Sequence, residues 1–175
     1  MEKKIDLPLT PEKIKELRAG DVVYLSGEMY VARDAAHRRL YELIQAGKPL
    51  PVDLKGETIY YMGPTPAREG RAVGSAGPTT SSRMDKYTPA LLDLGLLGMI
   101  GKGRRSDEVK ESAVRHGAVY FAAVGGAGAL LSERIEKCRV VCYEDLGAEA
   151  LRRIRVKDFP CIVALDAEGR DVYDS

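Results

Sequence analysis

Four short segments combine glycine with basic residues or hydroxyl groups, and each leads from a strand or loop into an expected helix. They are Arg33-Asp-Ala-Ala-His37, Gly77-Pro-Thr-Thr-Ser-Ser-Arg-Met-Asp85, Gly101-Lys-Gly-Arg-Arg105 and Gly125-Gly-Ala-Gly-Ala-Leu130. The first turn of a helix carries unpaired N–H groups and the positive end of the helix dipole, so it binds anions readily. These residue types therefore indicate binding of carboxylate or phosphate groups.

The first two segments each place an arginine beside other polar groups. Arg33 begins an expected helix and can hold a carboxylate with two parallel hydrogen bonds, and His37 lies one turn further on the same face. The hydroxyl residues 79–82 run into Arg83 and could form an oxyanion or carboxylate cradle with that arginine as counter-charge. Two simpler interpretations stay open. Arg33 and His37 could both be solvated surface residues. One hydroxyl of residues 79–82 could cap the helix expected to begin near Met84, with the others in a loop.

Lys102 lies between two glycines directly after the apolar strand expected at residues 96–100. This order places an ammonium group at the C-terminal edge of a strand, where open α/β sheets bind ligands, although a solvated turn explains it as well. Arg104 and Arg105 are expected on the surface. The glycines of residues 125–128 lack the spacing of a phosphate loop, so they indicate close packing of a helix.

The three cysteines have the spacing of neither a metal site nor a disulfide framework. Cys138 and Cys142 share an expected strand and are therefore about 13 Å apart, while Cys161 lies on another strand. We interpret them as reduced thiols of a cytoplasmic protein. The sequence also lacks HExxH and GxSxG motifs. The chain therefore offers cationic groups that could hold a carboxylate, but no evident electrophile or strong base. This is what we expect of a chain that contributes half of an active site.

Strands alternate with helices over most of the chain, which indicates an α/β domain with a partly parallel sheet. A hairpin is expected at residues 21–32 around Ser26-Gly27, so the sheet would be mixed or barrel-like. Other expected strands cover residues 54–62, 96–100, 118–124, 139–143 and 161–166. Expected helices begin at Thr10-Pro11 and cover residues 33–46, 84–94, 106–116, 125–133 and 148–152.

The composition is that of a globular protein, and residues 1–175 are expected to form one domain. The 27 basic and 26 acidic residues nearly cancel, so no overall field favours a nucleic acid or a membrane surface. No secretory signal is visible, and no apolar run approaches the roughly 20 residues of a membrane helix. A site that binds an anion must therefore depend on a local group of positive charges and not on the net charge of the chain.

With these segments in this order, the sequence resembles the β subunit, or C-terminal domain, of class I iron–sulfur fumarate hydratase and L(+)-tartrate dehydratase. The resemblance covers essentially the whole chain, and RDAAH followed by GPTTSSRMD is a specific signature. Further matching segments are Leu7-Pro-Leu9, Leu17-Arg-Ala-Gly-Asp21, Glu144-Asp-Leu-Gly147 and Val156-Lys-Asp-Phe-Pro160. The resemblance implies a swivelling β/β/α domain that closes over a [4Fe–4S] cluster held by three cysteines of another subunit or domain.

The resemblance also implies roles for individual residues. Arg33 and Arg83 match the two arginines that bind substrate carboxylates, and Lys102 matches the lysine beside them, with a binding and a catalytic role. Thr79 matches a threonine proposed to handle the C3 proton, but a hydroxyl is a weak base, so orientation of the substrate is the alternative. No catalytic role is assigned to His37, and no cysteine of this chain matches a cluster ligand.

The expected activity is hydro-lyase action on fumarate and (S)-malate, with an α subunit that carries the cluster in an α2β2-type complex. The expected ligand is a dicarboxylate, with no nucleic acid or membrane as partner. Tartrate dehydratase is the nearest alternative. A non-catalytic anion-binding module that regulates a partner is the rival from another functional class.

Overall fold

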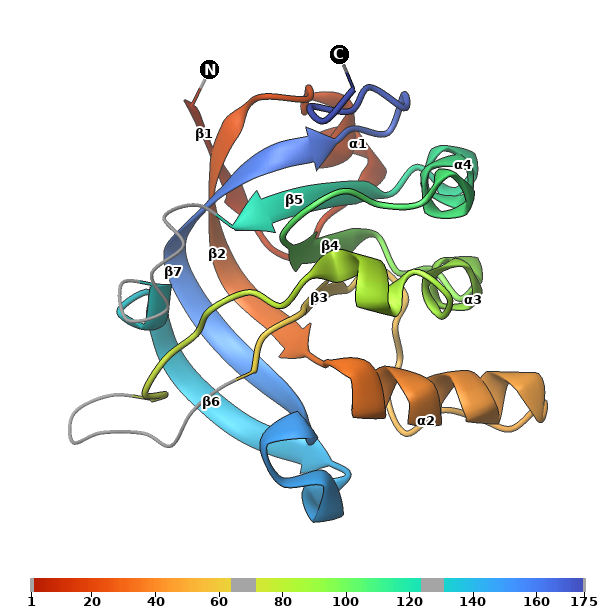
Figure 1. Ribbon diagram of the computed structural model, residues 1–175. Coiled ribbons are helices and arrows are strands. Elements are labelled where there is room, and N and C mark those ends of the chain that lie inside the picture. The colour runs from red at the N-terminus through yellow and green to blue at the C-terminus, as the bar shows by residue number, and fades with distance from the viewer. Residues whose placement is uncertain (1, 64–71, 124–130, 175) are drawn as a thin grey trace.

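The computed structural model describes residues 2–63, 72–123 and 131–174, and its centre is a closed β-barrel (Figure 1). Among these residues the strands form one sheet in the order β1-β2-β3-β4-β5-β7-β6, and β2 also pairs with β7. The strands are β1 (Glu2–Asp6), β2 (Val22–Val31), β3 (Thr58–Tyr60), β4 (Gly98–Gly101), β5 (Val119–Ala123), β6 (Ile135–Cys142) and β7 (Leu151–Leu165). The extra pairing closes β2, β3, β4, β5 and β7 into the barrel, with β1 and β6 attached outside it.

The sheet is mixed. Strands β1 to β5 run parallel to one another, whereas β7 is antiparallel to β2, β5 and β6. The α/β class and the barrel-like layer expected from the sequence are confirmed. Because β2, β3 and β4 run the same way, the segments that follow these three strands leave the barrel at one end.

The helices α2, α3 and α4 lie on one side of the barrel (Figure 1). The helical elements are α1 (Pro11–Lys15), α2 (Asp34–Gln45), η1 (Ser81–Met84), α3 (Thr88–Asp93), α4 (Asp107–His116) and η2 (Glu144–Glu149). Helix α1 begins at its expected cap, Thr10, whose hydroxyl accepts a hydrogen bond from the Lys13 N–H. Helix α4 is capped in the same way by Ser106 and ends at Gly117, which has a positive φ of 68°.

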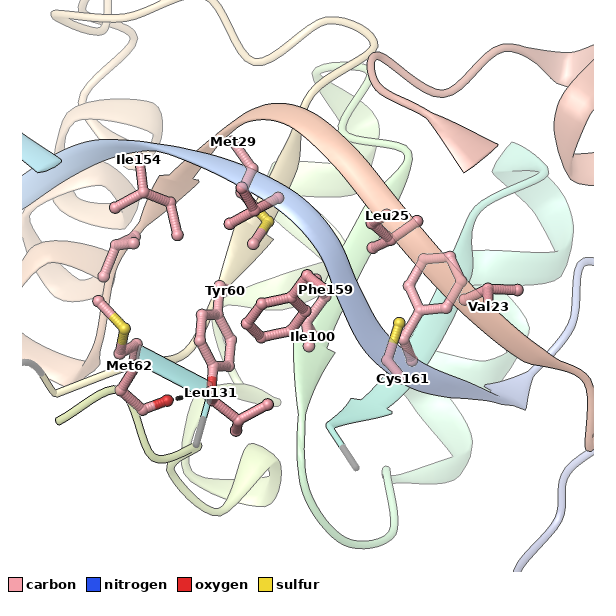
Figure 2. Close-up of a cluster of buried hydrophobic side chains, with 14 of the residues drawn as sticks. Val23, Leu25, Met29, Tyr60, Met62, Ile100, Leu131, Ile154, Phe159 and Cys161 are labelled. Carbon is pink, nitrogen blue, oxygen red and sulfur yellow. Dashed lines mark hydrogen bonds between the residues drawn. The ribbon is translucent and has the colours of Figure 1, made fainter. Parts of the chain in front are cut away.

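Strands β3, β4 and β5 are buried on both faces, and their side chains alternate between two cores. Tyr60, Ile100 and Phe121 belong to the barrel interior, where Tyr60 packs edge-on against Phe159 (Figure 2). The preceding residue of each strand, such as Met99, packs instead beneath the helices. This period-2 alternation explains the continuous apolar runs of these strands.

Two expectations about local structure are wrong. Residues 22–31 form one strand, not a hairpin, because Ser26-Gly27 makes an irregularity in the pairing with β7 instead of a turn. A Cβ atom at Gly27 would lie 2.9 Å from the Cβ of Leu7, so this glycine allows a close approach. The expected helix over residues 148–152 is also wrong, because Leu151 begins a 15-residue strand.

The helix expected over residues 125–133 lies mostly outside the described residues. No helix among the described residues is long and apolar enough to cross a membrane.

Candidate active site

Three of the four predicted segments meet at the end of the barrel where the parallel strands finish. The RDAAH segment follows β2, and the GKG segment follows the end of β4. The segment 77–85 passes between them, because Thr79 donates its N–H to the carbonyl oxygen of Tyr61, just after β3, at 2.7 Å. The fourth segment, residues 124–130, follows β5 and lies outside the described residues.

Backbone pairing brings Thr80, the chain neighbour of Thr79, beside Lys102. Thr80 forms an isolated parallel bridge with Lys102, and the Ser81 N–H donates to the Lys102 carbonyl oxygen at 2.9 Å. The Lys102 side chain is exposed and forms no ion pair with any residue that the structure describes. The lysine therefore presents a free ammonium group beside the hydroxyl-rich segment.

A buried chain of hydroxyl groups fixes this arrangement. The Ser81 hydroxyl lies 2.7 Å from the Tyr120 hydroxyl, which donates to the Gly103 carbonyl oxygen at 2.7 Å. Since Tyr120 has one hydroxyl proton, Ser81 is the donor of the first bond. A Cβ atom at Gly101 would lie 2.0 Å from the Ser81 Oγ, so only glycine leaves room for this contact.

None of the four hydroxyls acts as the expected helix cap. Thr80 precedes η1 but makes no side-chain capping bond, and the following helix α3 is preceded by Tyr87. Ser81 is buried and structural, so it is not available to a ligand. Of the four hydroxyl residues of the expected cradle, the partly exposed Thr79 and the exposed Thr80 and Ser82 remain accessible to a ligand.

Arg33 lies directly before helix α2 and is half-buried, which excludes the interpretation that it is a fully solvated residue. A Cβ atom at Gly63 would lie 2.1 Å from the Arg33 Nη1, so the glycine makes room for the guanidinium group. The Nε of Arg33 is buried and has no hydrogen-bond partner among the described residues. This arginine therefore keeps hydrogen-bonding capacity for a ligand.

Arg83 is bound by the residue next to Arg33. Its Nε and its Nη2 both lie 2.9 Å from the Asp34 Oδ2. The second oxygen of this carboxylate, Oδ1, is buried and has no partner in the described part of the chain. The ion pair joins the two predicted arginine segments.

His37 is completely buried, so the surface interpretation is wrong for it. Its Nδ1 lies 2.9 Å from the Arg33 carbonyl oxygen, which accepts the proton, and its ring packs edge-on against Tyr61 at 5.3 Å. Burial penalises the charged imidazolium and lowers the pKa of His37 from 6.5 to about 4. The ring is therefore neutral at pH 7 and fixes the backbone at the start of α2.

Arg105 is also buried, contrary to the expected surface position, whereas its neighbour Arg104 is exposed. The Arg105 Nε donates to Asp85 at 2.6 Å, and Nη2 donates to the hydroxyls of Tyr61 and Thr88. The guanidinium also stacks on the Tyr61 and Tyr120 rings. This residue ties η1 to the end of β4, so it supports the site and is not exposed to a ligand.

A carboxylate of the chain itself occupies the first turn of helix α2. The Ala35 N–H donates to the Glu149 Oε1 at 3.1 Å. The sequence pattern includes Asp34 in the RDAAH segment and Glu149-Ala150 among the segments that match the family, but it indicated no role for either acidic residue, and it placed Arg105 on the surface. Asp34 directly follows Arg33, so its position in the sequence could have suggested a role near the site. No local pattern connects residue 149 with residue 35, because their contact depends on the tertiary fold.

The three cysteines are free and do not converge on the site. Cys161 is buried in the barrel, and burial raises the pKa of its thiol well above 9. Burial also raises the thiol pKa values of Cys138 and Cys142 on β6. Within residues 2–63, 72–123 and 131–174, no group of three His, Cys, Asp or Glu side chains could hold a metal ion.

Comparison with known proteins identifies similar chains. The family model described as Fumarase C-terminus matches residues 1–175. Fumarate hydratase 2 of Leishmania major is 37% identical over 176 residues, which cover 97% of this chain and 31% of that protein. Fumarate hydratase class I, anaerobic, of Escherichia coli (strain K12) is 42% identical over 151 residues, which cover 85% of this chain and 28% of that protein.

A third relative has a similar length to this chain. The "Putative L(+)-tartrate dehydratase subunit beta" of Methanocaldococcus jannaschii is 36% identical over 172 residues, covering 95% of this chain and 88% of that protein. The chain therefore spans about a third of the length of the fumarate hydratases it matches and most of the length of this subunit.

Proposed function

The chain belongs to the Fumarase C-terminus family, and from this premise we propose that it supplies the carboxylate-binding half of a hydro-lyase active site. The reaction is the interconversion of fumarate and (S)-malate. The observation that carries the proposal is the gathering of Arg33, Arg83 and Lys102 at one end of the parallel strands. Positioned positive charge of this kind stabilises the negative charge that a dicarboxylate develops in the transition state.

The described residues do not fit the [4Fe–4S] cluster that the family resemblance implies. Three thiolates must converge on such a cluster, whereas Cys161 lies in the barrel core and the other two cysteines lie on β6. The proposal therefore assigns the cluster to an α subunit or α domain. The name of the M. jannaschii relative, a subunit beta, supports a divided enzyme. An α2β2-type complex, a swivelling closure and a cytoplasmic location are parts of the same proposal.

In the elimination of water from (S)-malate, a base takes the C3 proton, the electron pair of the C3–H bond forms the C2=C3 double bond, and the C2–O bond breaks. The hydroxyl group leaves and takes up a proton to become the water that is released. The two arginines and Lys102 hold the carboxylates and offset their charge. Thr79 is the chain neighbour of Thr80, which pairs with Lys102. A nearby ammonium group would stabilise an alkoxide, so the proposal has the Thr79 hydroxyl either take the proton or orient the substrate. Closure against the partner would bury the surface around Gly77–Arg83 and Gly101–Gly103.

The proposal is tested with the complex of this chain and its cluster-bearing partner. Steady-state rates are measured on (S)-malate, fumarate and L(+)-tartrate under anaerobic conditions. Turnover of malate and fumarate supports the proposal. Turnover of tartrate alone would replace the substrate pair, an alternative that the M. jannaschii relative specifically favours. Binding of succinate without turnover of any substrate would instead favour a regulatory anion-binding module.

A further inference from the structure

We propose that Asp34 is a positioning residue that holds the guanidinium group of Arg83 in the orientation that receives a substrate carboxylate. This inference rests on the proposed function, which assigns no role to Asp34. Asp34 is the first residue of helix α2 and the chain neighbour of Arg33. Its carboxylate therefore connects the two arginines of the clamp.

The geometry of the ion pair leaves one side of Arg83 free. A guanidinium group offers two faces to a carboxylate, one made by Nε with the nearer Nη atom and one made by the two Nη atoms. Asp34 uses the first face, because Nε and Nη2 both lie 2.9 Å from its Oδ2. The face formed by the two Nη atoms keeps its outward N–H groups for a second carboxylate.

The exposure of the two partners agrees with this division of roles. The Arg83 side chain is 52% exposed, whereas that of Asp34 is 32% exposed and its Oδ1 is buried. The carboxylate therefore lies on the protein side of the pair and the arginine on the open side. A long arginine side chain loses conformational entropy when it is fixed, so a preformed ion pair lowers the cost of binding a ligand.

A competing interpretation makes the opposite prediction. If Asp34 occupied the place of the substrate carboxylate, substrate would have to displace it, and removal of its charge would tighten binding. If Asp34 positions Arg83, removal of its charge weakens binding. The sign of the change therefore distinguishes the two interpretations.

The test compares Asp34→Asn with a matched control in the complete complex. Asp145→Asn removes a carboxylate that pairs with Arg39, an arginine of helix α2 to which the proposed function assigns no role. We expect Asp34→Asn to raise KM and the inhibition constant of succinate about tenfold, the effect of losing a little over 1 kcal/mol, with kcat within about threefold. Asp145→Asn should leave all three constants unchanged. Unchanged or lowered constants in Asp34→Asn would overturn the proposal.

A double-mutant cycle tests whether Asp34 acts through Arg83. In a background of Arg83→Ala, Asp34→Asn should cause no further rise in KM or in the inhibition constant of succinate. A full additional effect would show that Asp34 acts by another route and would also overturn the inference. Asp34→Glu retains the carboxylate and should bring KM back towards the wild-type value. Absence of turnover in the wild-type complex would count against the proposed function instead, so the two failures are distinguishable.

Discussion

At the residue scale, the positive charge of the candidate site is partly balanced by carboxylates from the chain itself. Asp34 binds Arg83, and Glu149 occupies the first turn of helix α2. Arg33 and Lys102 have no such partner among the described residues, so they hold the uncompensated charge.

Replacing Arg33, Arg83 or Lys102 by alanine should lower kcat/KM of the complex about 100-fold in each case. The physical reason is the loss of a charge-assisted contact worth roughly 3 kcal/mol in the transition state. Arg104→Ala is the matched control, because Arg104 is exposed and pairs with Asp174 instead. Steady-state kinetics and a thermal melt of each variant are the measurements. Wild-type kinetics for any of the three, in an intact complex, would remove that residue from the site.

The burial of His37 should make stability depend on pH. Above pH 6.5 the ring is neutral in both the folded and the unfolded state, so it contributes nothing to the dependence. Between pH 6.5 and about 4 the unfolded state binds a proton that the folded state does not, so stability falls by up to about 3 kcal/mol as the pH falls. His37→Phe lacks this contribution. Urea unfolding of both proteins at pH 7 and pH 4.5 measures it, and an equal pH dependence in both would refute the assignment.

At the scale of elements, the site depends on loops that are held by glycine contacts and by one buried arginine. Gly63 makes room for Arg33, Gly101 makes room for Ser81, and Arg105 joins η1 to the end of β4. These contacts fix the segments that leave neighbouring parallel strands.

Gly63→Ala should lower activity with little loss of stability. The new Cβ would lie 2.1 Å from the Arg33 Nη1, the far end of a flexible side chain, so the guanidinium can move away at small cost. We expect kcat/KM to fall at least about tenfold, because the arginine leaves its place. In a background of Arg33→Ala the substitution should have no further effect. An undiminished further loss in that background would show that Gly63 acts independently of Arg33.

Arg105→Met should destabilise the chain far more than Arg104→Met. The Arg105 side chain is 1% exposed, and its removal leaves the Asp85 carboxylate without its cation, at a cost of about 3–5 kcal/mol. The Arg104 side chain is 59% exposed, and loss of its ion pair should cost less than about 1 kcal/mol. Urea unfolding free energies of the two variants give the comparison. Similar values would contradict the supporting role of Arg105.

Helix caps and short runs of apolar residues are local patterns, and the sequence predicted the elements that such patterns mark. Helix α4 has its cap at Ser106 and its terminal glycine at Gly117, and both were readable from the sequence. Strand β7 was largely missed, because the charged residues between Leu151 and Val156 hide its buried face, and its long pairing with β2 joins residues more than 100 positions apart. The meeting of the predicted segments followed from the parallel order of the strands, whereas the Asp34–Arg83 pair depends on the tertiary fold.

At the scale of the whole molecule, the barrel carries α2, α3 and α4 on one side (Figure 1). The cationic segments follow β2 and β4 at one end of the parallel strands. The described residues include the cations and the Thr79 hydroxyl to which we assign substrate binding, and no group of three His, Cys, Asp or Glu side chains among them could hold a metal ion. The proposed enzyme is therefore divided: this chain holds the carboxylates, and the partner supplies the Lewis acid. The name of the M. jannaschii relative, a subunit beta, supports this proposed division.

The central claim, that this chain is half of an active site, is tested most directly by anaerobic reconstitution. The purified chain is treated with iron and sulfide, alone and together with its cluster-bearing partner, and fumarate hydration and cluster absorbance are measured in both samples. The account predicts no stable cluster and no turnover from the chain alone, and both in the presence of the partner. A stable cluster with turnover from this chain alone would contradict it.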